Sequence, residues 1–401
     1  MYKIFRQLNF SREINLLFLS IFIFAITIGI NAVTFPAILN KHNVSAAHIG
    51  IAFTCDTLGG IVMSFFLSRI VARLKMLRAM AFASCFYALI ILLIYFYQNL
   101  YLWIALAFMM GSLWFIYVIT RQSWLNILLK DKQRGVATGV FSMLISAGVA
   151  VGPVIVSFSG AESYLSFFIS ASLTLLSFAA ILLIKNKVNP DLHSRRIALS
   201  EFFKTNPRIF LARFFLDFQT YTLLIFTVIF GVKIGLSYEL AGLLISSYMA
   251  SGFFDVFVGF LLKKFSPYQL INLGFLGCLC CFLLIMFMRN YAFLFAAYFF
   301  FGISIACIFV SAFKVCNEDF SAEKLVAANA TFQLIGSIGA LCGSLVGGIL
   351  FNVFSAIGFP IAIVLSASCY LSFLVIYETR SNHSPLEGES TKPSVESVRG
   401  Y

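Results

Sequence analysis

Three carboxylates interrupt stretches of sequence that are otherwise almost wholly apolar: Asp56, Asp217 and Asp255. No lysine or arginine lies within a helical turn or two of Asp56. Burial disfavours the charged form of a carboxylate, so an unpaired Asp56 is suited to take up and release a proton. The alternative is a carboxylate satisfied by an arginine or by Thr54 and Thr57, and the sequence leaves both readings open.

A second group of charges surrounds Asp217. Arg213 precedes it by four residues, so the two side chains share one face of a helix and can pair. Asp255 lies at a similar depth in its own apolar segment, which allows a cluster of three. Such a cluster is either a structural ion-pair network or part of the chemistry of a site.

Two cations, Arg121 and Lys314, stand near the ends of two further apolar segments. If both faced one central cavity, they would suit an anionic or zwitterionic ligand. Alternatively, both extend to the membrane interface, a reading that Glu318 and Asp319 favour for Lys314 because they follow it closely. Three aromatic residues share segments with these charges and are candidates to line a cavity: Tyr117, Trp124 and Tyr221.

The composition identifies the elements that must position these residues. The chain has 401 residues, of which 61% are hydrophobic and 11% charged, against about 45–50% and 25% in soluble domains. A backbone in lipid must satisfy its own hydrogen bonds, which leaves helices or closed barrels. The apolar runs are too long and too uniform for barrel strands. We therefore expect an all-α membrane protein.

Twelve segments are long and apolar enough to cross a bilayer as helices. They are 15–38, 47–68, 79–97, 100–126, 136–159, 161–184, 207–230, 238–262, 270–289, 291–315, 325–351 and 356–377.

The basic residues predict the orientation of these spans. Loops rich in lysine and arginine alternate with poor ones, and the rich loops include 1–14, 69–78, 127–135 and 185–208. Cytoplasmic loops carry the positive charge, so both termini are expected in the cytoplasm and the protein in the plasma (inner) membrane. The net charge of +12 is then a signal of topology, and no nucleic-acid partner is expected.

The two halves of the chain resemble each other. "KHNVSAAHIG" from Lys41 matches "KIGLSYELAG" from Lys233, 192 residues later. The order of spans is preserved, which predicts two six-helix bundles related by an axis along the membrane normal. The expected domains are a first bundle at 1–184, a cytoplasmic linker with a short helix at 185–206, a second bundle at 207–378 and a disordered cytoplasmic tail at 379–401.

Paired glycines recur at matching places in the two halves. "FSMLISAGVAVG" matches "FQLIGSIGALCG" and brings Gly148 and Gly152 into register with Gly339 and Gly343. Small residues at this spacing let helices approach closely in lipid, and Pro153 is expected to bend its helix. We expect the fifth and eleventh spans to pack on each other across the axis and to form a moving interface; ordinary helix packing is the alternative.

The six-plus-six layout, the long central loop and "GVAVGP" (Gly148–Pro153) resemble the major facilitator superfamily of secondary transporters, over residues 1–378. "GVAVGP" is similar to the G-x-x-x-G-P-x-x-G-G motif of its drug/proton antiporters, although Val156 and Ser157 replace the final glycines.

A second superfamily motif, G-x-x-x-D-R-x-G-R/K, is recognisable in "SRIVARLKMLR". Ala72 replaces its aspartate and Arg73 keeps its arginine. In the superfamily that aspartate helps to latch the cytoplasmic gate, so the resemblance leaves open how this gate closes.

The resemblance implies a small molecule carried by alternating access, with protons as the expected coupling ion and efflux by antiport favoured. An uncoupled facilitator, or a proton symporter for an anionic or zwitterionic metabolite, is the alternative. No G-x-x-x-x-G-K-[ST] or H-E-x-x-H motif is present, so neither ATP-driven pumping nor enzymatic activity is expected. We expect no cofactor and no metal, and a functional monomer in the lipid bilayer.

Overall fold

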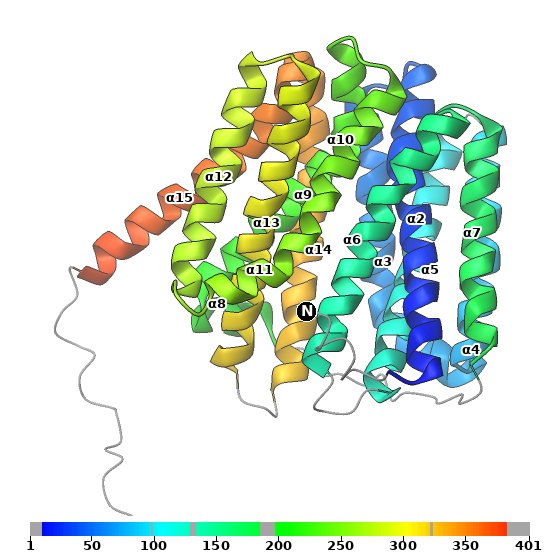
Figure 1. The fold of residues 1–401 in the computed structure, drawn as a ribbon, viewed down its shortest axis with the longest axis horizontal. Coiled ribbons are helices and arrows are strands. Elements are labelled where there is room, and N and C mark those ends of the chain that lie inside the picture. The colour runs from blue at the N-terminus through cyan, green and yellow to red at the C-terminus, as the bar shows by residue number, and fades with distance from the viewer. Residues whose placement is uncertain (1–9, 98, 129–133, 185–196, 321–323, 383–401) are drawn as a thin grey trace, which may run out of the picture.

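The computed structural model describes residues 10–97, 99–128, 134–184, 197–320 and 324–382, and within these ranges every regular element is a helix (Figure 1). The first six spans are α2 (Arg12–Lys41), α3 (Ala46–Leu74), α4 (Met76–Phe96), α5 (Leu100–Leu128), α6 (Arg134–Ser159) and α7 (Tyr164–Leu182). The last six are α9 (Pro207–Lys233), α10 with α11 (Tyr238–Ala250 and Phe254–Leu261), α12 (Pro267–Phe287), α13 (Tyr291–Asp319), α14 (Leu325–Phe354) and α15 (Gly358–Asn382). The predicted all-α membrane fold is confirmed.

By length and composition, 11 segments of the described chain can cross a membrane. The last of them, Ala327–Thr379, covers most of both α14 and α15, so the predicted twelve spans are all present as helices. The helix expected in the central linker is α8 (Leu199–Thr205), whose Phe202 is fully buried.

The internal repeat corresponds to two equivalent helical turns. Asn43 and Gly235, 192 residues apart, both have left-handed backbones, with φ of 56° and 96°. Ser45 and Ser237 then cap α3 and α10 by accepting hydrogen bonds from backbone N–H groups in the first turn, at 3.4 and 3.2 Å. The residues that match in the internal repeat thus form the turn and the N-cap that start the second span of each half.

The paired glycines pack within each half. Gly148 lies against the backbone of Phe22 in α2, and Gly339 lies against the backbone of Phe214 in α9. Gly152 and Gly343 contact the same two helices one turn further on. Each glycine pair packs closely on the first helix of its own half. The expectation that the fifth and eleventh spans pack on each other through these glycines is therefore wrong.

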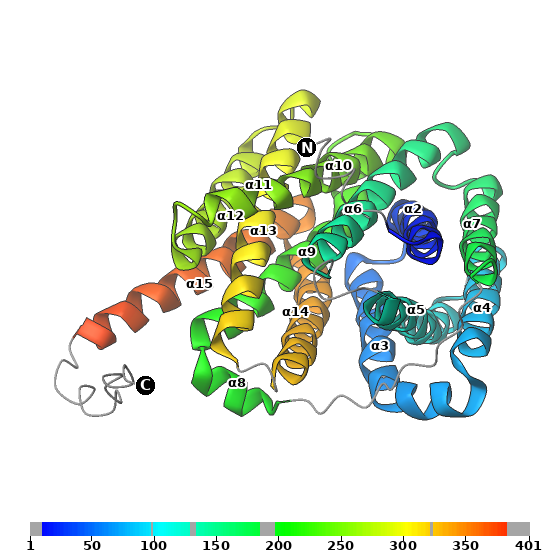
Figure 2. The ribbon, with the colours of Figure 1, turned by 60° about the horizontal axis from the view of Figure 1, so that its bottom comes forward.

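Different helices join the two halves. α3 packs along α14, and α6 packs along α10 (Figures 1 and 2). Gly50 of α3 lies against Gly348 of α14, so small residues do permit a close approach between the halves, but in the second and eleventh spans. α6 continues past Pro153 to Ser159.

The hydrogen bonds between the halves lie between the middle of the bundle and one of its ends. We call the end where α2 begins and α8 lies the linker end, and the opposite end, with the α2–α3 and α9–α10 turns, the far end. Among the described residues, three hydrogen bonds join residues 10–184 to residues 207–382: Asn40 to Tyr238 at 3.0 Å, the Ala161 N–H to Glu239 at 3.2 Å and Ser246 to the Ala150 carbonyl at 2.7 Å.

Candidate functional site

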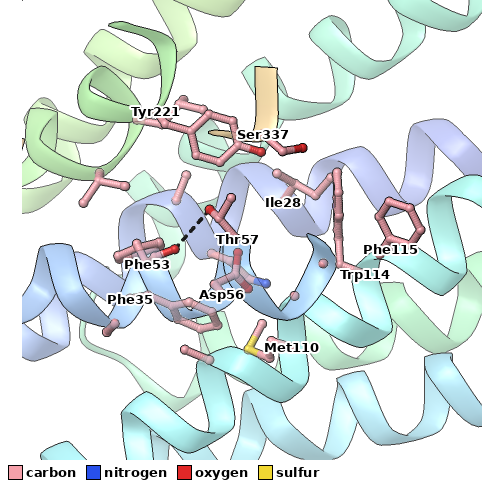
Figure 3. A pocket seen from close by; sticks show the side chains of 18 of the residues that line it. Ile28, Phe35, Phe53, Asp56, Thr57, Met110, Trp114, Phe115, Tyr221 and Ser337 are labelled. Atoms are coloured by element: carbon pink, nitrogen blue, oxygen red, sulfur yellow. Dashed lines mark hydrogen bonds between the residues drawn. The ribbon is translucent and has the colours of Figure 1, made fainter. Parts of the chain in front are cut away.

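A cavity of about 390 Å³ lies between the two halves (Figure 3). Its walls come from α2, α3, α4 and α5 of the first half and from α9 and α14 of the second. Most of the lining residues are apolar or aromatic, with a small number of polar groups among them. Concave, largely apolar spaces with a few placed polar groups are the usual form of small-molecule sites.

Asp56 is placed in this wall by a close crossing of α3 and α5. Gly111 of α5 lies directly on the backbone of Asp56, so that a side chain on Gly111 would overlap it. One turn along, Gly59 packs in the same way on the backbone of Phe108. The Ser112 hydroxyl donates to the Gly59 carbonyl at 3.1 Å and ties the two helices together. Three small residues therefore hold the backbone that carries Asp56.

The carboxylate of Asp56 lines the cavity, and the structure gives it no hydrogen bond or ion pair with any of the described residues. The neighbouring threonines do not satisfy it. Thr54 donates to the Gly50 carbonyl at 2.8 Å, and Thr57 donates to the Phe53 carbonyl at 3.1 Å (Figure 3). Of the two readings that the sequence left open, the unpaired carboxylate is the one found in the described part of the chain.

Arg213 and Asp217 form the opposite wall of the cavity. The Arg213 Nη2 donates to Asp217 at 2.6 Å, with the side chains 7% and 13% exposed. The same nitrogen donates to Gln333 of α14 at 3.1 Å. Gly336 leaves the room for this arrangement, because a side chain there would meet both members of the pair. The predicted i, i+4 pairing is confirmed.

Asp255 does not belong to this cluster. It lies in the first turn of α11, after the short 3₁₀ turn Ser251–Phe253 that separates α10 from α11. It is not among the residues that line the cavity. The expected cluster of Arg213, Asp217 and Asp255 is therefore wrong. The third residue that contacts the Arg213–Asp217 pair is Gln333 of the eleventh span, which accepts a hydrogen bond from Arg213.

Arg121 is buried inside the first half and faces neither the cavity nor the membrane surface, because it is 1% exposed. Its Nη2 donates to the Ser177 hydroxyl of α7 at 2.5 Å, and its guanidinium lies 3.4 Å from the centre of the Tyr117 ring. Tyr117 and Trp124 are buried too and do not line the cavity. Arg121 therefore neither faces the central cavity nor extends to the membrane interface, and both expectations for it are wrong. The expectation that Tyr117 and Trp124 line the cavity is wrong as well.

Lys314 lies at the surface of the bundle. It pairs with Glu318 at 3.7 Å, with the two side chains 38% and 60% exposed. The structure supports its extension to the interface. The expectation that Arg121 and Lys314 face one central cavity is therefore wrong for both residues. Arg73 is exposed in the last turn of α3 and has no ion pair with any described residue. Tyr221 does line the cavity, as expected.

The sequence analysis did not single out several polar residues of the cavity wall, among them Asn31, Tyr87 and Gln333. Asn31 accepts a hydrogen bond from Ser170 at 2.6 Å and lies 3.5 Å from the Tyr87 hydroxyl. The available signal was an amide side chain within an apolar span, because such groups rarely face lipid.

Comparisons with known proteins agree with this architecture. The family model described as Major Facilitator Superfamily matches residues 17–319 and 209–399. No curated protein matches at a significant level. The crystal structure of the nucleoside transporter NupG is 12% identical, with a TM-score of 0.76, and the likeness covers 92% of this chain and 99% of that one.

Further solved structures are similar, and two of them show the range. One is a bacterial homologue of the human lysosomal transporter Spinster in an inward-facing and occupied conformation, 16% identical with a TM-score of 0.72 over 92% of this chain and 96% of that one. The other is a POT family transporter in complex with a thioalcohol-conjugated peptide, 11% identical with a TM-score of 0.70 over 93% and 96%. At these identities the likeness concerns the fold alone.

Proposed function

Because this chain belongs to the Major Facilitator Superfamily, we propose that it is a secondary active transporter driven by protons, with Asp56 as the group that binds and releases the proton. The observation that carries this proposal is the unpaired carboxylate in the wall of a cavity between the two halves. A charge at membrane depth without a partner is costly, and a group kept at that cost is a candidate for function.

The position of Asp56 supports a coupling role. Its helix, α3, is one of those that pack across the halves, and the opposite wall of the cavity is α9 with α14. Rocking of the halves would change what faces the carboxylate. A proton shifts a two-state equilibrium only if it binds the two states with different affinity. A carboxylate at the moving boundary can meet that condition, because its surroundings change as the halves move.

The expected orientation assigns one end of the bundle to the cytoplasm. With both termini and the central linker in the cytoplasm, the linker end is cytoplasmic. The three hydrogen bonds that join the halves in the described part of the chain lie between the middle of the bundle and the far end. We propose that this state opens toward the cytoplasm and that the protein exports its substrate by antiport from the inner membrane as a monomer. The unit at 1–184 and the unit at 207–378 are the proposed moving bodies.

The test needs a substrate, which a thermal-shift screen of the purified protein would identify from grouped cations, anions and neutral metabolites. Nucleosides belong in the panel because NupG is a nucleoside transporter. In proteoliposomes with an imposed pH gradient, Asp56→Asn should abolish uphill transport and retain exchange of substrate between the two sides. Asp255→Asn is the matched control, because Asp255 is a membrane carboxylate outside the cavity.

Two results would contradict the proposal. Uphill transport by Asp56→Asn at the rate of the unmodified protein would move the coupling role to Asp217. Accumulation that survives a protonophore would favour the alternative, an uncoupled facilitator. Normal expression and a monodisperse elution profile of the variant establish that a loss of transport is not a loss of folding.

A further inference from the structure

The charges on the cavity wall restrict what the cavity can bind. Among the described residues that line it, three carry a formal charge: Asp56, Arg213 and Asp217. Arg213 and Asp217 cancel each other in a pair at 2.6 Å. When Asp56 is ionised, one negative charge is left, and it faces the open space of the cavity. An anionic substrate in the cavity would be repelled by this negative charge.

Arg213 is already engaged by groups of the protein, which disfavours it as the site of an anion. Its Nη2 is engaged by both Asp217 and Gln333, at 2.6 and 3.1 Å. The guanidinium is also covered by aromatic rings, with Phe332 at 4.8 Å and Phe309 at 5.4 Å from ring centre to Cζ. Its Nε is buried and has no hydrogen-bond partner among the described residues. A substrate carboxylate or phosphate that paired with the Arg213 Nη2 would have to displace Asp217 or Gln333. An arginine without such partners would not impose that cost.

The space around Asp56 is aromatic. Figure 3 shows Asp56 on the same wall as Phe53, with Phe35 beside it and Trp114 and Tyr221 further around the cavity. Aromatic faces attract cations through the negative charge of the ring face, and the attraction is strongest where water is excluded. A single carboxylate among aromatic rings therefore provides both parts of a site for an organic cation, one for the charge and one for the apolar body.

We propose, on the basis of the proposed function, that the substrate is a monovalent organic cation whose charge lies against Asp56 and whose apolar body lies on the aromatic wall. A divalent cation is not favoured, because the second carboxylate of the cavity is already paired with Arg213.

The same arrangement makes the cation and the proton compete for one carboxylate. The titratable or charged groups that face Asp56 across the cavity are Tyr87 from α4 and Arg213, Asp217 and Tyr221 from α9, while α14 offers the neutral Gln333 and Ser337. No second free carboxylate is present on the described walls to accept the displaced proton. Where Asp56 is protonated in the empty cavity, binding of the cation should therefore release a proton to solution, and transport should exchange one for the other.

The test is equilibrium binding to the full-length protein in detergent, without any gradient, using matched probes. One series is 1-methyl-4-phenylpyridinium, the neutral 4-phenylpyridine and the anionic 4-phenylbenzoate. The other is choline, 3,3-dimethylbutan-1-ol and 3,3-dimethylbutanoate. In at least one series the cation should bind about tenfold or more tightly than both analogues. Failure of both cations to bind, or an anion that binds as tightly as its matched cation, would overturn the proposal.

Variants assign the charge recognition to Asp56. Asp56→Asn should weaken binding of the cation about tenfold or more and leave the neutral analogue unchanged, Asp56→Glu should restore most of the affinity, and Asp255→Asn should change neither. Unchanged binding of the cation to Asp56→Asn would refute the assignment. Monodisperse elution of each variant excludes a folding defect.

The outcomes separate this inference from the proposed function. If the cation binds through Asp56 but releases no proton in weakly buffered solution and is not driven by a pH gradient, the coupling proposal fails and the cation site stands. If a pH gradient drives a neutral or anionic substrate instead, proton coupling stands and the cation site fails.

Discussion

The connection between α3 and α4 offers a sharp test of the structure, because Lys75 joins the two helices in a backbone conformation that favours glycine. Its φ is 63° and its ψ is 152°. The backbone is fixed on both sides: the Lys75 N–H donates to the Val71 carbonyl at 2.9 Å, and the Lys75 carbonyl accepts from the Ala79 N–H at 3.0 Å. In the loop motif G-x-x-x-D-R-x-G-R/K, with Ser68 at the first position, Lys75 stands at the second glycine.

The expected gain from Lys75→Gly can be worked out from this geometry. A residue with a side chain in this region of backbone conformation carries a strain of about 1–3 kcal/mol. Glycine relieves that strain but loses about 0.5–1 kcal/mol through its greater freedom in the unfolded chain. The Lys75 side chain is exposed and makes no hydrogen bond or ion pair with a described residue, so little else is lost. The two ranges leave a net stabilisation of about 0–2.5 kcal/mol, or about 1 kcal/mol from their midpoints.

Unfolding in mixed micelles by titration with a denaturing detergent measures this free energy. Lys75→Ala is the matched control, because it removes the same charge and side-chain length but keeps the Cβ and hence the strain. Lys75→Gly should be more stable than both Lys75→Ala and the unmodified protein. A Lys75→Gly variant no more stable than Lys75→Ala would refute the reasoning that the backbone at this position is strained.

Three further expectations concern the buried groups. Asp217→Asn should lower the unfolding free energy by about 3–5 kcal/mol, because it leaves Arg213 buried without its charged partner. The double variant Arg213→Met/Asp217→Leu should recover much of that loss. If the double variant is instead less stable than Asp217→Asn in the same titration, this reasoning is contradicted. Gly111→Ala should cost about 1–3 kcal/mol by overpacking the α3–α5 crossing, and equal stability to the unmodified protein would show that the crossing is looser than described. Ser177→Ala should cost about 1.5–3 kcal/mol because it removes a hydrogen bond from a buried arginine, and Ser177→Thr, which keeps the hydroxyl, should cost less; identical thermal stability of the two variants would argue against that bond.

Much of the fold follows from the sequence alone, because the signals that encode it are local. A span is a run of apolar residues, and a run of the required length can satisfy its backbone only as a helix. The turn that begins the second span of each half is equally local, since Asn43 and Gly235 supply the left-handed residue and Ser45 and Ser237 the cap. The Arg213–Asp217 pair was predictable for the same reason, because four residues of helix bring the two side chains together.

The candidate site was only partly predictable, because the sequence gives the depth of a residue along its span but not the direction in which it points. Arg121 lies at the depth expected of it, yet it points into the first half toward Ser177. Gly148 has the spacing of a contact between helices, and only the packing of α6 decides that the partner is α2. Asp56 could be recognised as a carboxylate without a cation nearby in the chain.

The tertiary structure alone placed Asp56 opposite the Arg213–Asp217 pair and brought Gln333 to Arg213 from a distant span. The rotation of each helix about its axis is fixed by contacts with all its neighbours at once. No single segment of the sequence carries that information.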